Sequence, residues 1–342
     1  MSYTKEQVVK ALSNVLYFPK GENIIALKMV DDIKIEGKKI SFSVVFPKMD
    51  DKTIPVVVKA CEGAILSNLG KDVKIKGNIH VKAENENSSL SGVKNIIAIA
   101  SGKGGVGKST VAVNLAIALS QKGLKVGLID ADIYGPSIPI MFGLENERPK
   151  VKEENGKHVV IPIEKFGIKL LSIGFFVDAN QALIWRGPMA SNALNQLFND
   201  ADWGELDFLV VDLPPGTGDI HLTLAQTYPV SGAIIVSTPQ QVAISDVKKA
   251  TSMFNQDKIS IPILGVIENM AYFTPAELPD NKYYIFGKNG CKKFADELGI
   301  PFLGQIPLVQ SISESGDKGK PITLDKNNPS SKAFNKIADI II

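Results

Sequence analysis

The sequence predicts an α/β protein, in which a mostly parallel sheet with helices on both faces is preceded by a small α+β domain. From Val93 onward, short apolar runs that are typical of buried parallel strands alternate with segments of helical pattern. A glycine-rich loop joins the first of these runs to the first helical segment. Before this region the chain has its own helical and strand-like segments, so we expect domains at 1–82 and 93–342 and a polar linker at 83–92.

The small domain is expected to contain two helices and three strands. Thr4 and Gln7 have the spacing of a capping box, which predicts a helix start. Thr53 and Gly70 flank a second helical segment, as its N-cap and as the residue just past its end. In chain order we expect a helix after Thr4, strands around 23–29 and 39–46, a helix at 53–68 and a strand at 72–79.

The second domain is expected to alternate strands with helices. The apolar residues of 331–342 lie near helical spacing, and with only two lysines this tail is expected to dock on its own domain rather than on a membrane. Strands are expected at 95–100, 126–130, 168–173, 208–212, 233–237, 263–267 and 302–306, and helices at 111–119, 190–198, 240–254 and 290–298.

The loop after the first strand of this domain has the phosphate-binding pattern G-x-x-x-x-G-K-[ST], from Gly102 to Ser109. Its glycines allow backbone N–H groups to surround phosphates, and the following helix contributes the partial positive charge of its N-terminus. Lys108 is expected to reach the β- and γ-phosphates, and the Ser109 hydroxyl to ligate Mg²⁺. The nucleotide-binding residues expected in this loop are Gly102, Lys103, Gly104, Gly105, Val106, Gly107, Lys108, Ser109 and Thr110.

Three carboxylates follow strands of the same predicted sheet. Asp130 and Asp132 end one apolar run, and Asp212 ends another. Because open α/β sheets bind ligands beyond the carboxyl ends of their strands, these side chains are expected to face the crevice of the phosphate loop. Phosphoryl transfer needs Mg²⁺ ligands, which suits Asp212, and a group that orients water. The alternative for an aspartate at a strand end is a cap on the next turn.

The segment 214–219 that follows Asp212 is rich in proline and glycine, and we expect a loop that a γ-phosphate can remodel. His221 lies just after this loop. It could sense the nucleotide state, but a capping or surface role is the favoured alternative.

Composition excludes several classes of protein. The 342 residues are 44% hydrophobic, with a formal net charge of +2, which gives no electrostatic case for nucleic acid or membrane binding. No apolar run approaches the roughly 20 residues of a transmembrane helix, and the N-terminus does not read as a signal peptide. Two cysteines exclude a disulfide framework, so we expect a cytoplasmic protein.

Lys103 inside the loop resembles the early lysine of the deviant Walker A motif in the SIMIBI class of ATPases. Within that class, the chain from about 93 to 340 resembles the Mrp/ApbC family of ATP-dependent iron–sulfur cluster carriers. The small domain looks like the cluster-assembly-associated domain that often precedes these ATPases. Besides the loop, the matching stretches are Asp130-Ala131-Asp132-Ile133-Tyr134-Gly135-Pro136-Ser137, Trp185-Arg186-Gly187-Pro188-Met189, Asp212-Leu213-Pro214-Pro215-Gly216-Thr217-Gly218-Asp219 and Ile267-Glu268-Asn269-Met270.

The resemblance implies an Mg²⁺-dependent ATPase that acts as a homodimer and delivers [4Fe–4S] clusters to apoproteins. Its partners would be a second copy, client apoproteins and iron–sulfur assembly proteins. It implies that Lys103 reaches the partner's nucleotide, that Asp132 orients the attacking water, and that Asp130 joins Ser109 and Asp212 around Mg²⁺. Asn269 would read the adenine edge, and Pro307 would wall the base. The Trp185-Arg186 pair is expected either at the dimer face or in plain packing.

The chain departs from the family at the cluster ligands. Members commonly carry a Cys-x-x-Cys shortly after the Glu-Asn-Met segment, but residues 271–287 contain no cysteine here. Cys291 is a possible substitute, because it lies near a helix start whose dipole would lower the thiol pKa, while Cys61 is expected in the core. A nucleotide-switched scaffold without a cluster is therefore an alternative hypothesis for the function. A ParA/MinD-like partitioning or positioning ATPase is a third, disfavoured by the near-neutral charge.

Overall fold

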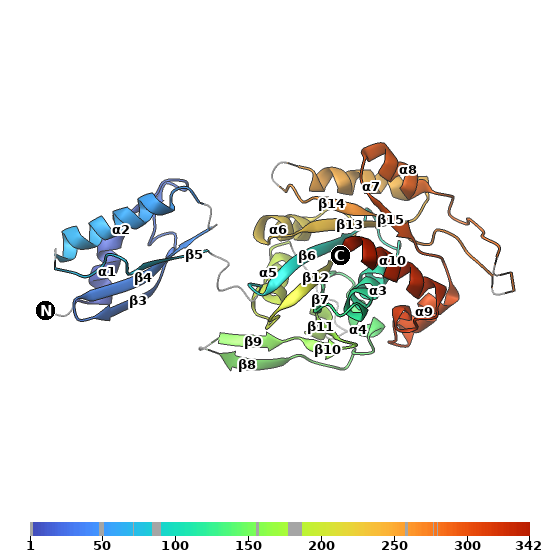
Figure 1. Cartoon of the computed structure of the whole chain (residues 1–342), viewed down its shortest axis with the longest axis horizontal. Helices are drawn as coiled ribbons and strands as arrows, with labels where there is room; N and C mark the ends of the chain where they lie inside the picture. The colour runs from blue at the N-terminus through green and yellow to red at the C-terminus, as the bar shows by residue number, and fades with distance from the viewer. Residues whose placement is uncertain are drawn as a thin grey trace. The chain divides into compact units, whose positions relative to one another are not determined.

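The computed structural model divides into two compact units, residues 1–91 and 92–342, each with its own hydrophobic core (Figure 1). The structure describes residues 3–47, 51–70, 72–83, 90–154, 157–176, 187–256, 259–275, 277–278 and 280–342. Trp185, Arg186 and most of the expected linker therefore lie outside the described residues.

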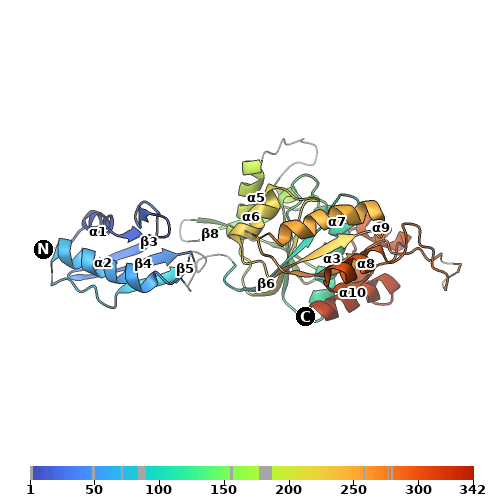
Figure 2. The ribbon, with the colours of Figure 1, turned by 90° about the horizontal axis from the view of Figure 1, so that it is seen from above.

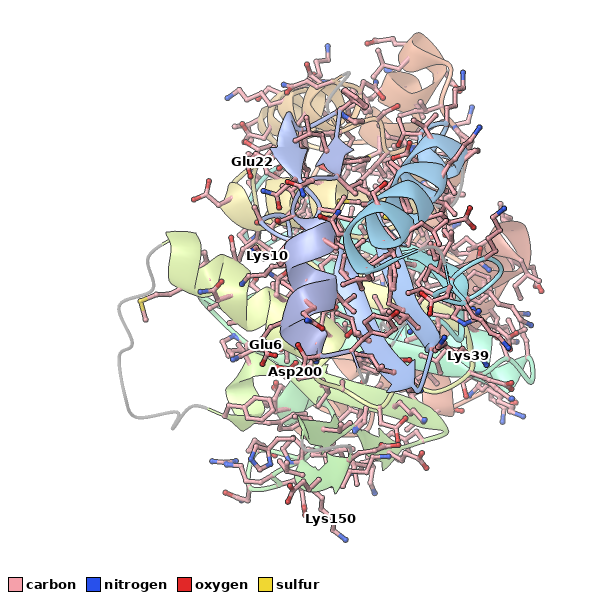
Figure 3. All side chains as sticks on the ribbon, turned by 90° about the vertical axis from the view of Figure 1, so that its left-hand side faces the viewer. Glu6, Lys10, Glu22, Lys39, Lys150 and Asp200 are labelled. Carbon is pink, nitrogen blue, oxygen red and sulfur yellow. The ribbon has the colours of Figure 1, made fainter. Side chains whose placement is uncertain are left out.

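The first unit packs two helices against a three-stranded sheet of order β3-β4-β5. Strand β4 pairs antiparallel with β3 and parallel with β5, and its Phe42 is buried in the same core as Leu12 and Cys61. Glu6 and Lys10 are exposed along the outer side of the first helix (Figure 3). The elements are α1 (Lys5–Leu12), β1 (Leu16–Tyr17), β2 (Glu22–Asn23), β3 (Val30–Glu36), β4 (Lys39–Phe46), α2 (Ile54–Leu69) and β5 (Ile79–Ala83).

The capping box at the first helix is confirmed, because Thr4 and Gln7 each accept the backbone N–H of the other. Two strand predictions in this unit are wrong. The segment 23–29 forms turns instead, since the Asn23 side chain accepts the N–H groups of Ile25 and Ala26, at 3.1 and 2.8 Å. The segment 72–79 is not one strand: it contributes an isolated bridge at Lys74 and the first residue of β5, because the chain turns at Gly77 with a φ of 75°.

The second unit is built on an eight-stranded sheet, counted over the described residues, of order β10-β11-β7-β12-β6-β13-β14-β15. The pairs from β11 to β15 are all parallel, while β10 joins β11 antiparallel. A separate antiparallel pair is formed by β8 and β9. The strands are β6 (Val93–Ala100), β7 (Val126–Asp130), β8 (Lys150–Glu154), β9 (Lys157–Ile161), β10 (Ile163–Lys165), β11 (Ile168–Ser172), β12 (Leu206–Asp212), β13 (Gly232–Ser237), β14 (Ile263–Glu268) and β15 (Phe302–Gln305).

Helices cover both faces of this sheet, with α3 and α10 on one side and α7 and α8 on the other (Figures 1 and 2). The predicted fold class is thereby confirmed. The tail docks on its own domain as predicted, since Phe334 and Ile337 of α10 are buried against α3. The helices are α3 (Lys108–Gln121), α4 (Ile138–Met141), α5 (Gly187–Asn199), α6 (Asp219–Thr227), α7 (Gln241–Phe254), α8 (Gly290–Leu298), α9 (Gln310–Asp317) and α10 (Pro329–Ile341).

Sequence patterns missed the strands between 150 and 165, because this segment is rich in charged residues and half-exposed on both sides. They also missed α6, which begins directly after the proline- and glycine-rich loop. No helix within the described ranges is both long and apolar enough to span a membrane.

Candidate nucleotide-binding site

The glycine-rich loop connects the end of β6 to the start of α3, as the motif predicts. Gly105 and Gly107 have φ values of 79° and 82°, in the left-handed region that favours glycine. Gly107 is the N-cap of α3, so the unpaired N–H groups of the first helical turn lie at the mouth of the loop. At Gly102 a Cβ would overlap the backbone of Asp246 on α7. The loop therefore needs its glycines both for its turns and for its packing.

Lys108 is buried at the centre of this loop and is surrounded by carboxylates. Its Nζ donates to Oδ1 of Asp212 at 2.6 Å and lies 3.6 Å from Oδ2 of Asp132. The Ser109 hydroxyl oxygen is 3.3 Å from the same nitrogen. A buried ammonium needs such partners, because leaving it unpaired in the interior would cost several kcal/mol. The loop lysine and two of the three predicted aspartates thus form one cluster.

The register of the sheet brings the carboxylates together. Asp212 pairs with Asp130 across β12 and β7, and Asp130 pairs with Ser172 across β7 and β11. Asp130 is buried and accepts hydrogen bonds from the Ser172 hydroxyl at 2.9 Å and from the backbone N–H groups of Asp132 and Ile138, both at 3.2 Å. Ser172 is a functional neighbour not predicted from the sequence, although it is a polar residue at a strand end, as both aspartates are.

Burial dominates the protonation of these acids. It raises the pKa of Asp130 to about 7, and the charge of Asp212 adds to the effect, while the hydrogen bonds from Ser172 and Ile138 and the charge of Lys108 oppose it. Burial also raises the pKa of Asp132 and of Asp212, against the opposing charge of Lys108. A divalent cation placed here would offset this cost, since it favours the charged carboxylates.

The donor set fits Mg²⁺. Oδ2 of Asp212 is buried and has no hydrogen-bond partner among the described residues, while the Ser109 hydroxyl contacts the same Lys108 nitrogen as Asp212 Oδ1. Mg²⁺ typically takes one or two protein carboxylates and completes its shell with substrate phosphates and water. No group of three or more His, Cys, Asp or Glu is gathered for a metal in the described part of the chain, and such a site does not need one.

Two adjoining cavities lie along the loop. One of about 290 Å³ is lined by the loop from Ser101 to Thr110 and by Asp132 and Pro215. The other, of about 430 Å³, is lined by Gly107 and Thr110 again and by apolar and polar residues from three further segments. Its wall includes Ser137, Met141, Asn269, Met270, Pro307, Leu308 and Ile312. The size and order of the cavities suit a phosphate chain followed by a base.

Asn269 and Pro307, which the resemblance assigns to the base, both lie in the wall of the second cavity. The Asn269 side chain is buried, and its Nδ2 donates to the carbonyl oxygen of Val106 at 2.8 Å. Lys103 is only half-buried, and its side chain forms no ion pair with any residue that the structure describes.

His221 is an N-terminal residue of α6 and is buried beside the loop that follows Asp212. Its Nδ1 accepts the N–H of Gly218 at 3.2 Å, so the capping role is the one found. Burial lowers the pKa of His221 to about 4, and the charge of Lys108 adds to this.

This shift predicts an acid-labile contribution to stability. Between about pH 6.5 and 4 the folded state keeps His221 neutral, while the same histidine is protonated in the unfolded chain. The contribution of His221 to the free energy of unfolding is therefore complete above pH 6.5 and is lost as the pH falls through this window. The loss amounts to about 3 kcal/mol, at 1.36 kcal/mol per pKa unit. We expect His221→Gln, which keeps an acceptor for Gly218, to remove this part of the pH dependence.

Urea unfolding of wild type and His221→Gln at pH 4 to 8 measures the effect. The two curves should approach each other as the pH falls from 6.5 to 4. Curves that stay parallel over the whole range would mean that His221 is not held neutral.

The two cysteines lie in different units, and both are free and buried. Cys291 at the start of α8 is fully buried, and burial together with the neighbouring Glu268 carboxylate raises its thiol pKa well above the usual range. The prediction that the helix dipole would lower this pKa was wrong, because desolvation outweighs the dipole. Cys61 is buried in the core of the first unit, as expected, and its pKa is raised to about 12.

The fold and this site define a P-loop nucleoside triphosphatase. Residues 92–342 match the model of the NUBPL iron-transfer P-loop NTPase family, and residues 5–76 match that of the iron–sulfur cluster assembly protein family. The chain belongs to the NUBPL iron-transfer P-loop NTPase family.

Relatives match over most of their length. The chain is 43% identical over 325 residues to an iron–sulfur cluster carrier protein of Synechocystis, covering 93% of this chain and 91% of that protein. It is 44% identical to one of Aquifex aeolicus, covering 98% and 97%. A nucleotide-binding protein of Archaeoglobus fulgidus, solved in complex with ADP, is 36% identical with a TM-score of 0.60, covering 71% of this chain and 92% of that one. The MinD ATPase of Pyrococcus furiosus, at 23% identity and a TM-score of 0.52, shares the fold, over 72% of this chain and 98% of that one.

Proposed function

We propose that this protein is an Mg²⁺-dependent ATPase that acts as a homodimer in the transfer of iron–sulfur clusters to apoproteins. The observation that carries the ATPase assignment is the buried cluster of Lys108 with Asp132 and Asp212 at the base of a glycine loop. The names of the relatives and the match of residues 5–76 to the assembly-protein family support the cluster-transfer role. A cytoplasmic location and partners other than nucleic acid or membrane agree with the net charge of +2.

The loop residues would bind the phosphates first. Backbone N–H groups from Gly104 to Ser109 would surround the β-phosphate, and Lys108 would leave the carboxylates to contact the β- and γ-phosphates. Ser109 and Asp212 would hold Mg²⁺, and Asp130 would also belong to the shell around it. The cation would neutralise phosphate charge in the transition state. The nucleobase would enter the cavity bounded by Asn269 and Pro307.

The release of Lys108 has a consequence for Asp132. In the structure its Oδ2 lies 3.6 Å from Lys108 Nζ, and Asp132 lines the cavity at the phosphate loop. Once the phosphates take over the lysine, Asp132 is left as the acceptor that orients a water molecule toward the γ-phosphate. Its pKa is raised by burial, which makes it a better proton acceptor than an exposed aspartate.

The second active-site lysine would come from the partner. Lys103 is half-buried on the loop and unpaired within the described ranges, so a second copy docked on this face would receive it near its own γ-phosphate. Hydrolysis would remove the group that both lysines bind, and the dimer would loosen.

The iron–sulfur cluster would be cargo, and the two copies would have to supply its ligands. Two copies would supply Cys291 twice, short of the four thiolates that usually hold a [4Fe–4S] cluster. The burial of Cys291 and the lack of cysteine in 271–287 favour a second candidate function, a nucleotide-switched scaffold of iron–sulfur assembly that holds no cluster. In that function the ATPase cycle is the same, and the first unit docks the assembly proteins.

Anaerobic reconstitution with iron and sulfide, on the full chain and on Cys291→Ser, decides between these two functions. A carrier predicts about four irons per dimer with a sulfide-to-iron charge-transfer band that the variant loses. A scaffold predicts colourless, iron-free protein that still hydrolyses ATP. Cys61→Ser is the matched control, because Cys61 is equally buried but lies in the other unit.

A further inference from the structure

Asn269 is packed directly against the phosphate loop. Its side chain is only 5% exposed, and its Nδ2 donates to the carbonyl oxygen of Val106 at 2.8 Å. The next loop residue, Gly107, has no room for a side chain, because a Cβ there would overlap this same nitrogen. The amide thus fills the space next to Val106 and Gly107 in the last turn of the loop.

The neighbouring strands hold Asn269 in place. Its backbone N–H donates to the carbonyl of Ser237 at the end of β13, at 2.8 Å. The preceding residue, Glu268, is fully buried; it accepts the N–H of Cys291 at 2.8 Å and the side-chain amide of Gln305 at 2.7 Å. These bonds tie the end of β14 to β13, to β15 and to the first turn of α8.

We propose that Asn269 is a positioning residue for the phosphate loop. By holding the Val106 carbonyl, it keeps that negative dipole turned away from the phosphates and keeps the N–H groups of the loop turned toward them. One N–H of its amide is committed to this bond, so removal of the side chain should weaken phosphate binding whichever base is present. The inference rests on the proposed nucleotide binding and adds a role that base recognition does not contain.

The distinction is measurable by competition binding on the full chain. We expect Asn269→Ala to weaken Mg²⁺-ATP, Mg²⁺-GTP and inorganic tripolyphosphate by a similar factor, roughly tenfold, because a buried carbonyl loses its donor and the loop its constraint. Asn269→Ser, which keeps a small donor, should lose less. A residue that only read the base would lower ATP affinity toward that of GTP and leave tripolyphosphate unchanged, and this result would overturn the proposal.

Asn95 offers a matched control. Its Nδ2 also donates to a backbone carbonyl, that of Asp207 at 3.1 Å, but at the opposite end of the strand that leads into the loop. Asn95→Ala should bind all three ligands as wild type does, and equal losses in both alanine variants would overturn the proposal by pointing to general destabilisation. Wild type that binds none of the three ligands would instead refute the proposed function.

Discussion

Replacing Lys108 by alanine is expected to abolish ATP turnover, with a loss of at least 10²- to 10³-fold in kcat, as for other preorganised transition-state contacts. The lysine is the cation nearest to the expected phosphates, and it lies 2.6 Å from Asp212 in the free protein. Its removal also leaves Asp132 and Asp212 without their cation, so the pKa values of both acids should rise further. Phosphate release with saturating Mg²⁺-ATP measures the first effect.

Lys122→Ala is the matched control, because this lysine lies at the other end of α3 and pairs with the exposed Asp339. It should hydrolyse ATP at the wild-type rate. Turnover that survives in Lys108→Ala would refute the assignment of the loop.

Replacing Lys103 by alanine is expected to leave nucleotide affinity nearly unchanged and to lower turnover by roughly 10³-fold, the scale of a catalytic cation supplied by a partner. The reason is the different environment of the two lysines, since Lys108 is buried among carboxylates while Lys103 has no ion pair within the described part of the chain. Binding of a fluorescent ATP analogue, measured beside phosphate release, separates the two quantities.

A mixture of the two variants tests whether the lysine acts across the dimer. In a mixed dimer, the chain with Lys103→Ala keeps Lys108 and receives Lys103 from the chain with Lys108→Ala. One site is then complete, so the mixture should hydrolyse ATP although each variant alone does not. A mixture as inactive as its parts would show that Lys103 acts within its own chain.

The parts of the site that could be predicted from sequence are those fixed by local pattern. The loop glycines and Lys108 are adjacent in the chain, and Asp130 and Asp212 end apolar strands, so their shared edge follows from a parallel sheet. Ser172 could have been added by the same rule, because the sheet places it beside Asp130.

Other features depend on contacts between distant segments. Cys291 lies at a helix start, which by itself favours a lowered thiol pKa. Burial in the core and the Glu268 carboxylate, which lies 23 positions earlier in the chain, raise this pKa instead. The bond from Asn269 to Val106 spans 163 positions and has no sequence signal. In the first unit, the apolar residues after Asn23 resemble a strand, but the side-chain bonds of Asn23 and the backbone bonds of the same segment form turns instead.

The central claim is that two copies of this chain together hydrolyse Mg²⁺-ATP. Phosphate release by the wild-type full chain, measured per chain over a wide range of protein concentration with and without Mg²⁺, tests it most directly. The account predicts turnover that requires Mg²⁺ and rises with protein concentration until the dimer is saturated. Turnover per chain that is independent of concentration, or the same without Mg²⁺, would contradict it.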